Sequence, residues 1–307
     1  MKSLSKQFML VLLLGFLIGA AACTKAKYDD DYTKGNVPPI GNYNNSNDVA
    51  AANLVAHWTF DSTNEETISH TAPANAINAS FVKGIKGPAL HLNAGYILYP
   101  VISALNTANG LASCTVSMWI NVDNNGSQAT EFFALTPDPT TQTDWGSVLN
   151  MYAETGHPVS TDDTLALHAA VGTYASGVRA GGDNINDYGT RETDFKTVHG
   201  TNKWIQYVLR YDAVQSTVDI YANGTLVSNN NFRVRMVNGA LLGPLVSPIP
   251  VQVLIGGFPN AATGFPLSGA QSWQALLTGS IDELRVYNKA LGDDEIHALF
   301  SFERLGS

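Results

Sequence analysis

Cysteine is nearly absent from this chain of 307 residues, which contains only Cys23 and Cys114. Cys23 ends an N-terminal apolar segment, so Cys114 has no partner for an intramolecular disulfide bond. Exported domains without disulfides depend on their own hydrophobic core for stability. Residues 53–303 are long enough to bury such a core as one domain. Cys114 lies in a stretch typical of a strand and is expected to be a small buried residue.

Charge is also scarce, and positive charge most of all. Charged residues make up 14% of the chain, with 17 Lys and Arg against 26 Asp and Glu and a formal net charge of −9. Typical globular proteins are about 25% charged. No run of basic residues occurs in the sequence. Nucleic acid and anionic lipid are therefore excluded as expected partners, because both are bound through clustered Lys and Arg.

Long apolar runs are missing as well, and a helix needs about 20 apolar residues to span a bilayer. The apolar run at residues 8–18 follows Lys2 and Lys6 and precedes Ala20-Ala21-Ala22-Cys23. This order is typical of a secretory signal, and the final cysteine resembles that of a bacterial lipobox, with Ala20 where the pattern prefers Leu. We therefore expect a lipoprotein signal peptide at residues 1–22, lipid on Cys23, and membrane attachment through this anchor only. The alternative is ordinary signal-peptidase cleavage.

Residues 23–52 lack apolar periodicity and are rich in Asp, Asn, Gly and Lys, which predicts a flexible tether. Asp29-Asp30-Asp31 lies shortly after the cysteine and resembles the acidic export signal of some Bacteroidetes lipoproteins. That resemblance implies an outer-membrane lipoprotein of the cell envelope, displayed on the cell surface. A solvated acidic patch in a linker is the other interpretation.

Six strand-like blocks follow the tether. They resemble, in order, the motifs of laminin-G-like and concanavalin A-like lectin–glucanase domains, and they are Leu54–Asp61, Lys83–Asn93, Thr115–Asn121, Trp204–Asp212, Val253–Gly257 and Thr278–Leu291. The resemblance implies an all-β fold, a two-sheet antiparallel jelly-roll sandwich, with a short C-terminal helix at residues 292–300. Asp293 is the expected N-cap of this helix. Asn223-Gly224, between two alternating stretches, predicts a tight hairpin because both turn residues need positive φ.

Two stretches have no counterpart in these motifs, residues 136–202 and 238–274. Both are rich in Gly, Pro, Asp and Asn, so we expect long loops at the ends or edges of the sheets. They contain Trp145 and Trp273, respectively. An exposed indole can stack on a sugar ring, and a carboxylate such as Asp144 can accept hydrogen bonds from its hydroxyls. We expect these three residues to contact a ligand; the alternative is that each indole folds back to pin its own loop.

Motifs for catalysis are missing from the sequence, which has no nucleophile elbow, zinc-protease motif or phosphate-binding loop. Glucanases that share this fold place alternate carboxylates on one strand, so that both face the same cleft. Asp282 and Glu283 are adjacent instead, which places them on opposite faces of a regular strand. We therefore predict a binding module and no enzyme. A glycoside hydrolase or lyase with carboxylates assembled across loops is the alternative.

Asp61 ends the first predicted strand and Asp282 begins the last. The first and last strands of a jelly roll pair side by side, and many related sandwich domains hold a structural Ca²⁺ where these strands meet. Carboxylate and carbonyl oxygens suit that ion, so the resemblance implies a Ca²⁺ site at Asp61 and Asp282. The alternative is that Asp61 caps a turn and Asp282 accepts hydrogen bonds from backbone amides.

The resemblance implies a carbohydrate-binding or adhesion module of the cell envelope, with a glycan or polysaccharide as partner. Function inferred from fold is associational, because one fold supports many sites. A structural or protein-interaction module that binds no sugar is therefore a further alternative.

Overall fold

The structure, a computed structural model, describes residues 39–126, 128–155, 163–185 and 190–307. Residues 1–22, Cys23 and the acidic stretch at 29–31 lie outside the described residues. The regular structure of the described part is mostly strand. The strands are β1 Leu54–Trp58, β2 Asn75–Lys83, β3 Pro88–Leu98, β4 Cys114–Val122, β5 Ala129–Pro137, β6 Leu149–Thr155, β7 Thr164–Ala175, β8 Val178–Ile185, β9 Val198–His199, β10 Ile205–Asp212, β11 Thr217–Ala222, β12 Thr225–Leu226, β13 Met236–Val237, β14 Ala240–Leu241, β15 Val251–Ile255, β16 Gln274–Ala275 and β17 Leu277–Tyr287. The helical elements are η1 Ser46–Asp48, η2 Ala51–Asn53, η3 Ala261–Thr263 and α1 Asp293–Arg304.

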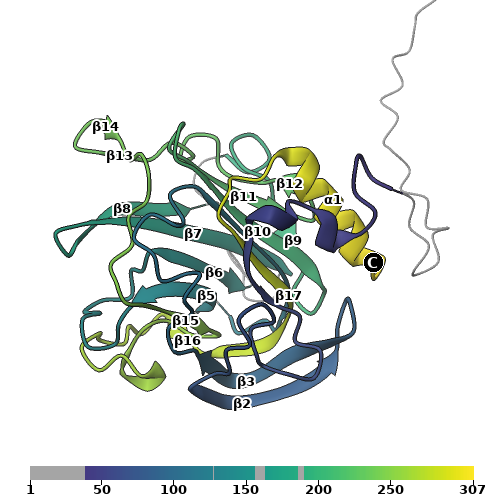
Figure 1. Ribbon diagram of the computed structural model, residues 1–307, viewed down its shortest axis with the longest axis horizontal. Coiled ribbons are helices and arrows are strands. Elements are labelled where there is room, and N and C mark those ends of the chain that lie inside the picture. Colours follow the sequence, from purple (N-terminus) through teal and green to yellow (C-terminus); the bar gives the residue numbers. More distant parts are fainter. Residues whose placement is uncertain (1–38, 127, 156–162, 186–189) are drawn as a thin grey trace, which may run out of the picture. The chain divides into compact units, whose positions relative to one another are not determined.

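Most of the strands belong to one curled sheet, whose main order is β12-β11-β10-β4-β17-β3-β15-β5-β6-β7-β8 (Figure 1). Its strand pairs are antiparallel, except that β16 pairs parallel with β5. Because the sheet curls, β10 packs face to face against β5 and β7. Tyr207 of β10 contacts the ring of Phe132 edge-on and donates a hydrogen bond to the carbonyl of His168. The structure confirms the predicted all-β antiparallel sandwich with a C-terminal helix.

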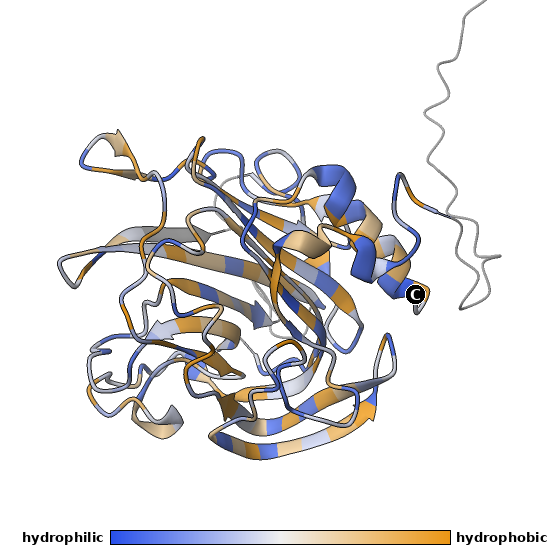
Figure 2. Ribbon diagram, in the orientation of Figure 1, coloured by the Kyte–Doolittle hydropathy of each residue, from blue (hydrophilic) through white to orange (hydrophobic). Residues whose placement is uncertain are grey.

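Strand β4 shows why this sequence forms a layered sheet. Val116, Met118 and Ile120 point into the main core, while Ser117 and Trp119 point to the opposite face, and all five are buried. A strand with both faces covered lies in the middle of a layered structure. The contrasting case is β2, which pairs with β3 and is exposed along nearly its whole length, although its hydrophobic and hydrophilic residues alternate (Figure 2).

The first and last strands pair as predicted, with His57 of β1 opposite Arg285 of β17. The predicted hairpin is also confirmed. Asn223 and Gly224 have φ values of 50° and 72° and connect β11 to β12. This backbone conformation is the one that a two-residue turn between twisted strands requires.

Helix α1 covers the outer face of β10, β11 and β17. Ile296, Leu299 and Phe302 are buried there against Val208 and Tyr221. Its N-cap is Gly292 and not the predicted Asp293: the carboxylate of Glu295 accepts the backbone N–H of Gly292 at 2.7 Å. This is the Glu half of a capping box.

The carboxylate of Asp293 is engaged elsewhere, because it accepts hydrogen bonds from Arg210 at 2.7 Å and Tyr221 at 2.6 Å. Among the described residues, no helix combines the length and the apolar character needed to cross a membrane.

The predicted tether is too long at its C-terminal end. Residues 40–53 form η1 and η2 and pack against α1, with Tyr43 partly buried and Val49 buried in the same cluster as the helix. The hydroxyl of Ser46 donates to the carbonyl of Ser307 at 2.8 Å, which joins this segment to the end of the chain. The few apolar residues of the segment have no period, so the sequence pattern alone does not reveal this packing.

The expectation that residues 136–202 form loops is wrong. This stretch contains β6, β7, β8 and β9, so it supplies one end of the main sheet. Strands β6 and β7 were expected to be loops, and β7 contains four alanines, a residue that is a poor strand former by itself. They are strands because both of their faces are covered, and residues 149–153 and 164–171 are buried almost throughout.

Candidate functional site

Trp145 and Trp273, predicted from separate insertions to contact a ligand, lie against each other. Their ring centroids are 5.5 Å apart and their planes are at 87°, the edge-to-face arrangement that aromatic rings prefer. Both rings also contact Phe258, with centroid distances of 6.0 Å and 5.1 Å. Phe258 is buried, whereas the two indoles are only partly buried. The structure therefore brings the two residues together, and each indole supports the other insertion as well as its own.

The aromatic cluster rests on the outer face of the sheet. Tyr152 of β6 contacts Trp145 at 5.9 Å and Phe258 at 5.5 Å between ring centroids. Its other ring face stacks on His168 of β7 at 4.9 Å. Tyr152 and His168 were not predicted, because their strands were expected to be loops. The alternation of Asn150 and Tyr152 with apolar neighbours was the available signal.

A buried polar pair holds the Trp145 loop in place. Asn150 donates to the carboxyl of Glu131 at 2.6 Å and to the carbonyl of Trp145 at 3.2 Å, and it accepts from the amide of Ser147 at 2.8 Å. Glu131 is fully buried. Burial raises its pKa well above the usual range, since the hydrogen bond from Asn150 offsets only part of the desolvation. These two side chains support the loop from below.

Asp144, the third predicted ligand residue, lines a cavity of about 520 Å³ beside the same loop. The cavity lies among the β5–β6 loop, the turn between β7 and β8, and residues 248–250. Its other polar side chains include Gln142, Tyr174 and Arg179. Trp145 does not line it, so its indole and the Asp144 carboxylate share a loop but face different spaces.

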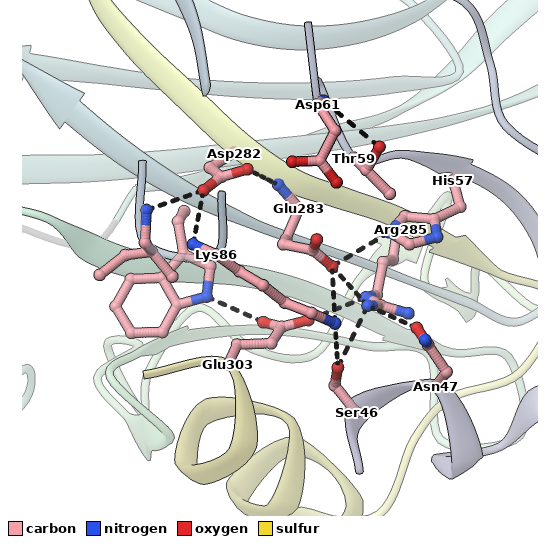
Figure 3. A network of polar contacts seen from close by, with 12 residues as sticks. Ser46, Asn47, His57, Thr59, Asp61, Lys86, Asp282, Glu283, Arg285 and Glu303 are labelled. Atoms are coloured by element: carbon pink, nitrogen blue, oxygen red, sulfur yellow. Dashed lines mark hydrogen bonds and ion pairs between the residues drawn. The ribbon is translucent and has the colours of Figure 1, made fainter. Parts of the chain in front are cut away.

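The predicted metal pair, Asp61 and Asp282, lies in another part of the molecule, where β1 meets β17 (Figure 3). Both aspartates pack against the turn between β2 and β3. A Cβ atom placed on Gly87 would lie 2.1 Å from Oδ1 of Asp61, and one on Gly84 would lie 2.3 Å from Oδ2 of Asp282. The turn therefore needs glycine at both positions. Asp61 is exposed and Asp282 is buried.

The carboxylate of Asp282 is occupied by backbone donors. Oδ2 accepts the amides of Ile85 at 2.8 Å and Lys86 at 3.1 Å, and Oδ1 accepts the amide of Glu283 at 2.9 Å. Three amide donors on one carboxylate match the alternative interpretation of Asp282 better than they match a calcium ligand. Among the described residues, no group of three or more His, Cys, Asp or Glu is arranged to hold a metal ion.

Calcium at Asp61 and Asp282 stays a prediction with a direct test. An ion that binds only the folded protein, at about 100 times its Kd, adds about 2.7 kcal/mol. The melting temperature of the wild type would then rise by several degrees on adding Ca²⁺, and that of Asp61→Asn would not. Equal melting temperatures in calcium and in chelator would remove the ion from this pair.

A β-bulge changes the predicted geometry of Asp282 and Glu283. The register between β17 and β4 shifts between Asp282 and Arg285, and Glu283 has a φ of 47°. A bulge places one extra residue on a strand and re-aims its side chains. The two carboxylates therefore lie on the same side of the sheet (Figure 3), contrary to the expectation of opposite faces.

Glu283 and Arg285 belong to a buried network of charges. Arg285 donates to Glu303 at 2.8 Å through Nε and to Glu283 through Nη2, while His57 lies 3.1 Å from Glu283. Trp119 donates to Glu303 at 2.8 Å. The network links β1, β4, β17 and α1. Arg285 also donates a hydrogen bond to the side chain of Asn47 at 3.0 Å, so the folded segment of residues 40–53 belongs to the network as well (Figure 3).

The network separates the pKa values of its carboxyl groups. Burial opposes ionisation of Glu283, but the hydrogen bond from His57 and the charge of Arg285 hold its pKa at about 2. Burial raises the pKa of Glu303 to about 7, against the charge of Arg285. Burial also raises the pKa of Asp282 to about 8, helped by the charge of Glu283 and opposed by the amides of Lys86, Ile85 and Glu283.

Comparison with known proteins finds similarity to solved structures. No family model matches the sequence, and no curated protein matches it. Domain 4 of AbnA, a GH43 extracellular arabinanase from Geobacillus stearothermophilus solved with arabinotriose, is 17% identical over 80% of this chain and 98% of that domain, with a TM-score of 0.46. The binding domain of Paraclostridial Mosquitocidal Protein 1 is 14% identical over 81% of this chain and 52% of that one, with a TM-score of 0.50.

Trypanosoma rangeli sialidase, in complex with 2,3-difluorosialic acid, is 15% identical over 82% of this chain. Its TM-score is 0.49. This chain spans about half of the toxin structure and a third of the sialidase. At 14% identity, the similarity to the toxin binding domain concerns the fold alone.

Proposed function

We propose that the protein is a glycan-binding module of the cell envelope. The observation that carries the proposal is the paired, partly buried Trp145 and Trp273 on the outer face of the sheet. Two indoles braced by Phe258 and Tyr152 form a rigid apolar surface, and rigid aromatic anchors lose little conformational entropy on binding. The neighbouring cavity offers amide, hydroxyl, carboxylate and guanidinium groups for hydroxyls of the same ligand.

We expect Trp145→Ala and Trp273→Ala each to weaken glycan binding roughly 30-fold, because truncating a central aromatic anchor costs about 2 kcal/mol. The measurement is the affinity for immobilised plant and host polysaccharides, at a temperature where each variant is folded. Phe232→Ala is the matched control, since Phe232 is 40% exposed and lies outside the cluster.

Unchanged affinity in both tryptophan variants would place the site elsewhere on the sandwich. Trp145→Phe separates packing from binding: it keeps an apolar ring against Phe258, so the melting temperature should recover more than the affinity does. If no polysaccharide binds the wild type, the alternative of a structural or protein-interaction module replaces the proposal.

We propose binding without cleavage. Glu131 lies under the Trp145 loop, but it is fully buried and bonded to Asn150, so it supports the loop and does not reach a substrate. Release of reducing ends from any polysaccharide that binds would favour the hydrolase alternative.

We propose that the module is an outer-membrane lipoprotein held by lipid on Cys23. Metabolic labelling with a fatty acid should mark the wild type and should lose its signal in Cys23→Ser. Cys114→Ser is the control and should label like the wild type, because Cys114 is buried. Labelling of Cys23→Ser at the wild-type level would leave ordinary cleavage as the better interpretation.

A further inference from the structure

The guanidinium of Arg179 packs against Gly146 and Gly172 at the cavity that Asp144 lines. A Cβ atom on Gly172 would lie 2.5 Å from Nε of Arg179, and one on Gly146 would lie 3.0 Å from Cζ and Nη1. Any side chain at Gly172 would displace the guanidinium. Nε donates to the carbonyl of Ser147 at 2.9 Å, which fixes the orientation of the group.

The terminal nitrogens of Arg179 have no partner among the described residues. Nη2 is buried without a hydrogen bond, and no carboxylate of the described chain lies within ion-pair distance of the group. Arg210, Arg233 and Arg285 are all paired with carboxylates. A partly buried guanidinium held in place with unused donors is the arrangement that recognises a carboxylate, often through two parallel hydrogen bonds.

The rest of the cavity indicates what carries that carboxylate. Asp144 is exposed, and its Oδ2 can accept hydroxyl hydrogen bonds, while Oδ1 accepts the amide of Gly146 at 2.6 Å. Tyr174 adds a hydroxyl to the cavity. Val178 and Ile249, which are 70% and 57% exposed, give the cavity apolar walls for a C–H face. A small inorganic anion would leave these walls and Asp144 without a role. A sugar that carries a carboxylate uses all of them.

We infer that this cavity binds an acidic sugar residue, with Arg179 on its carboxylate and Asp144 on its hydroxyls. The inference rests on the proposed glycan-binding function and names its ligand class. The chain is acidic overall, with a net charge of −9. At physiological salt, however, charges more than about 8 Å apart are largely screened. The contact with Arg179 then outweighs repulsion from the carboxylates outside the cavity.

The test compares one sugar with and without its charge, using the full-length protein. Oligogalacturonate should bind about tenfold or more tightly than its methyl ester, since a charged hydrogen bond is about twice as strong as a neutral one and the ester removes the charge while adding only one methyl group. Sialyllactose against lactose is a second arm, which distinguishes a sialic acid from a uronic acid. Arg179→Gln should abolish the preference for the charged sugar, and Arg179→Lys should retain part of it. Arg191→Gln changes the net charge equally at an exposed position and should leave the preference intact.

Equal binding of acid and ester together with equal binding of sialyllactose and lactose, or a preference that survives in Arg179→Gln, overturns the inference. If neutral glycans bind through Trp145 and Trp273 while neither acidic sugar is preferred, only the inference fails. If no glycan binds at all, the proposed function fails with it. A melting temperature measured for each variant, together with the Arg179→Lys result, separates loss of the donor from loss of the fold.

Discussion

Replacing Arg285 with methionine should lower the free energy of unfolding by about 3–5 kcal/mol, because removing one member of a buried ion pair leaves uncompensated charge in the interior. Arg285, Glu283 and Glu303 are all buried, and the guanidinium bonds to both carboxylates. Urea unfolding at pH 7 measures the loss. Lys203→Met is the control: its ion pair with Asp163 is exposed and 3.1 Å long, and such pairs contribute about 1 kcal/mol or less.

Two further measurements identify charge as the cause. Adding Glu283→Gln and Glu303→Gln to Arg285→Met should recover part of the loss, because neutral amides need no cation. The loss from Arg285→Met alone should also be smaller at pH 5 than at pH 7, since protonation relieves carboxylates that have lost their partner. A single variant that unfolds like the wild type would show that the network contributes little to stability.

The wild type should lose stability as the pH rises from about 4 to about 8, through Asp282. Burial raises the pKa of Asp282 to about 8 in the folded protein, against about 3.9 in an unfolded chain. The folded protein therefore holds a proton that unfolding releases. Its contribution is complete below pH 4 and is lost as the pH passes 8, at up to about 1.4 kcal/mol per pH unit. Across the window the loss is on the order of 5 kcal/mol.

The measurement is the difference in the free energy of unfolding between wild type and Asp282→Asn, determined by urea unfolding at several pH values. The side-chain amide of the variant does not titrate. Its altered backbone contacts should therefore change the free energy of unfolding by a nearly constant amount, and the steep fall of that free energy with pH should be lost. The difference cancels the other groups of the network. Those are Glu303, whose raised pKa acts in the same direction, and His57 and Glu283, whose lowered pKa values act in the opposite direction. Parallel curves for the two proteins would refute a protonated Asp282.

The candidate site was predictable in its parts and not in its assembly. Trp145 and Trp273 stand out because the strand motifs leave them without a core position. Their mutual contact depends on where two loops meet, and sequence spacing does not report that. Arg179 was not predicted, since a single arginine in a weakly patterned stretch has no signature. Two structural features indicate a role for Arg179. Gly146 and Gly172 leave room for its guanidinium, and the described chain provides no carboxylate partner for it.

The resemblance to laminin-G-like domains implied the fold class and the pairing of the first and last strands. The sequence by itself determined the Asn223-Gly224 turn and the C-terminal helix. These features depend on local alternation, on turn residues with positive φ, and on composition near helix ends, all of which are written in consecutive residues. Only the tertiary structure decided that β6 and β7 are strands, because both strands are buried on both faces, and in β7 this burial outweighs the weak strand propensity of four alanines. It also decided that the β17 bulge turns Glu283 to the side of Asp282 and Arg285. Buried charges are stable only where distant elements bring their partners within hydrogen-bond distance, and no local pattern encodes that distance.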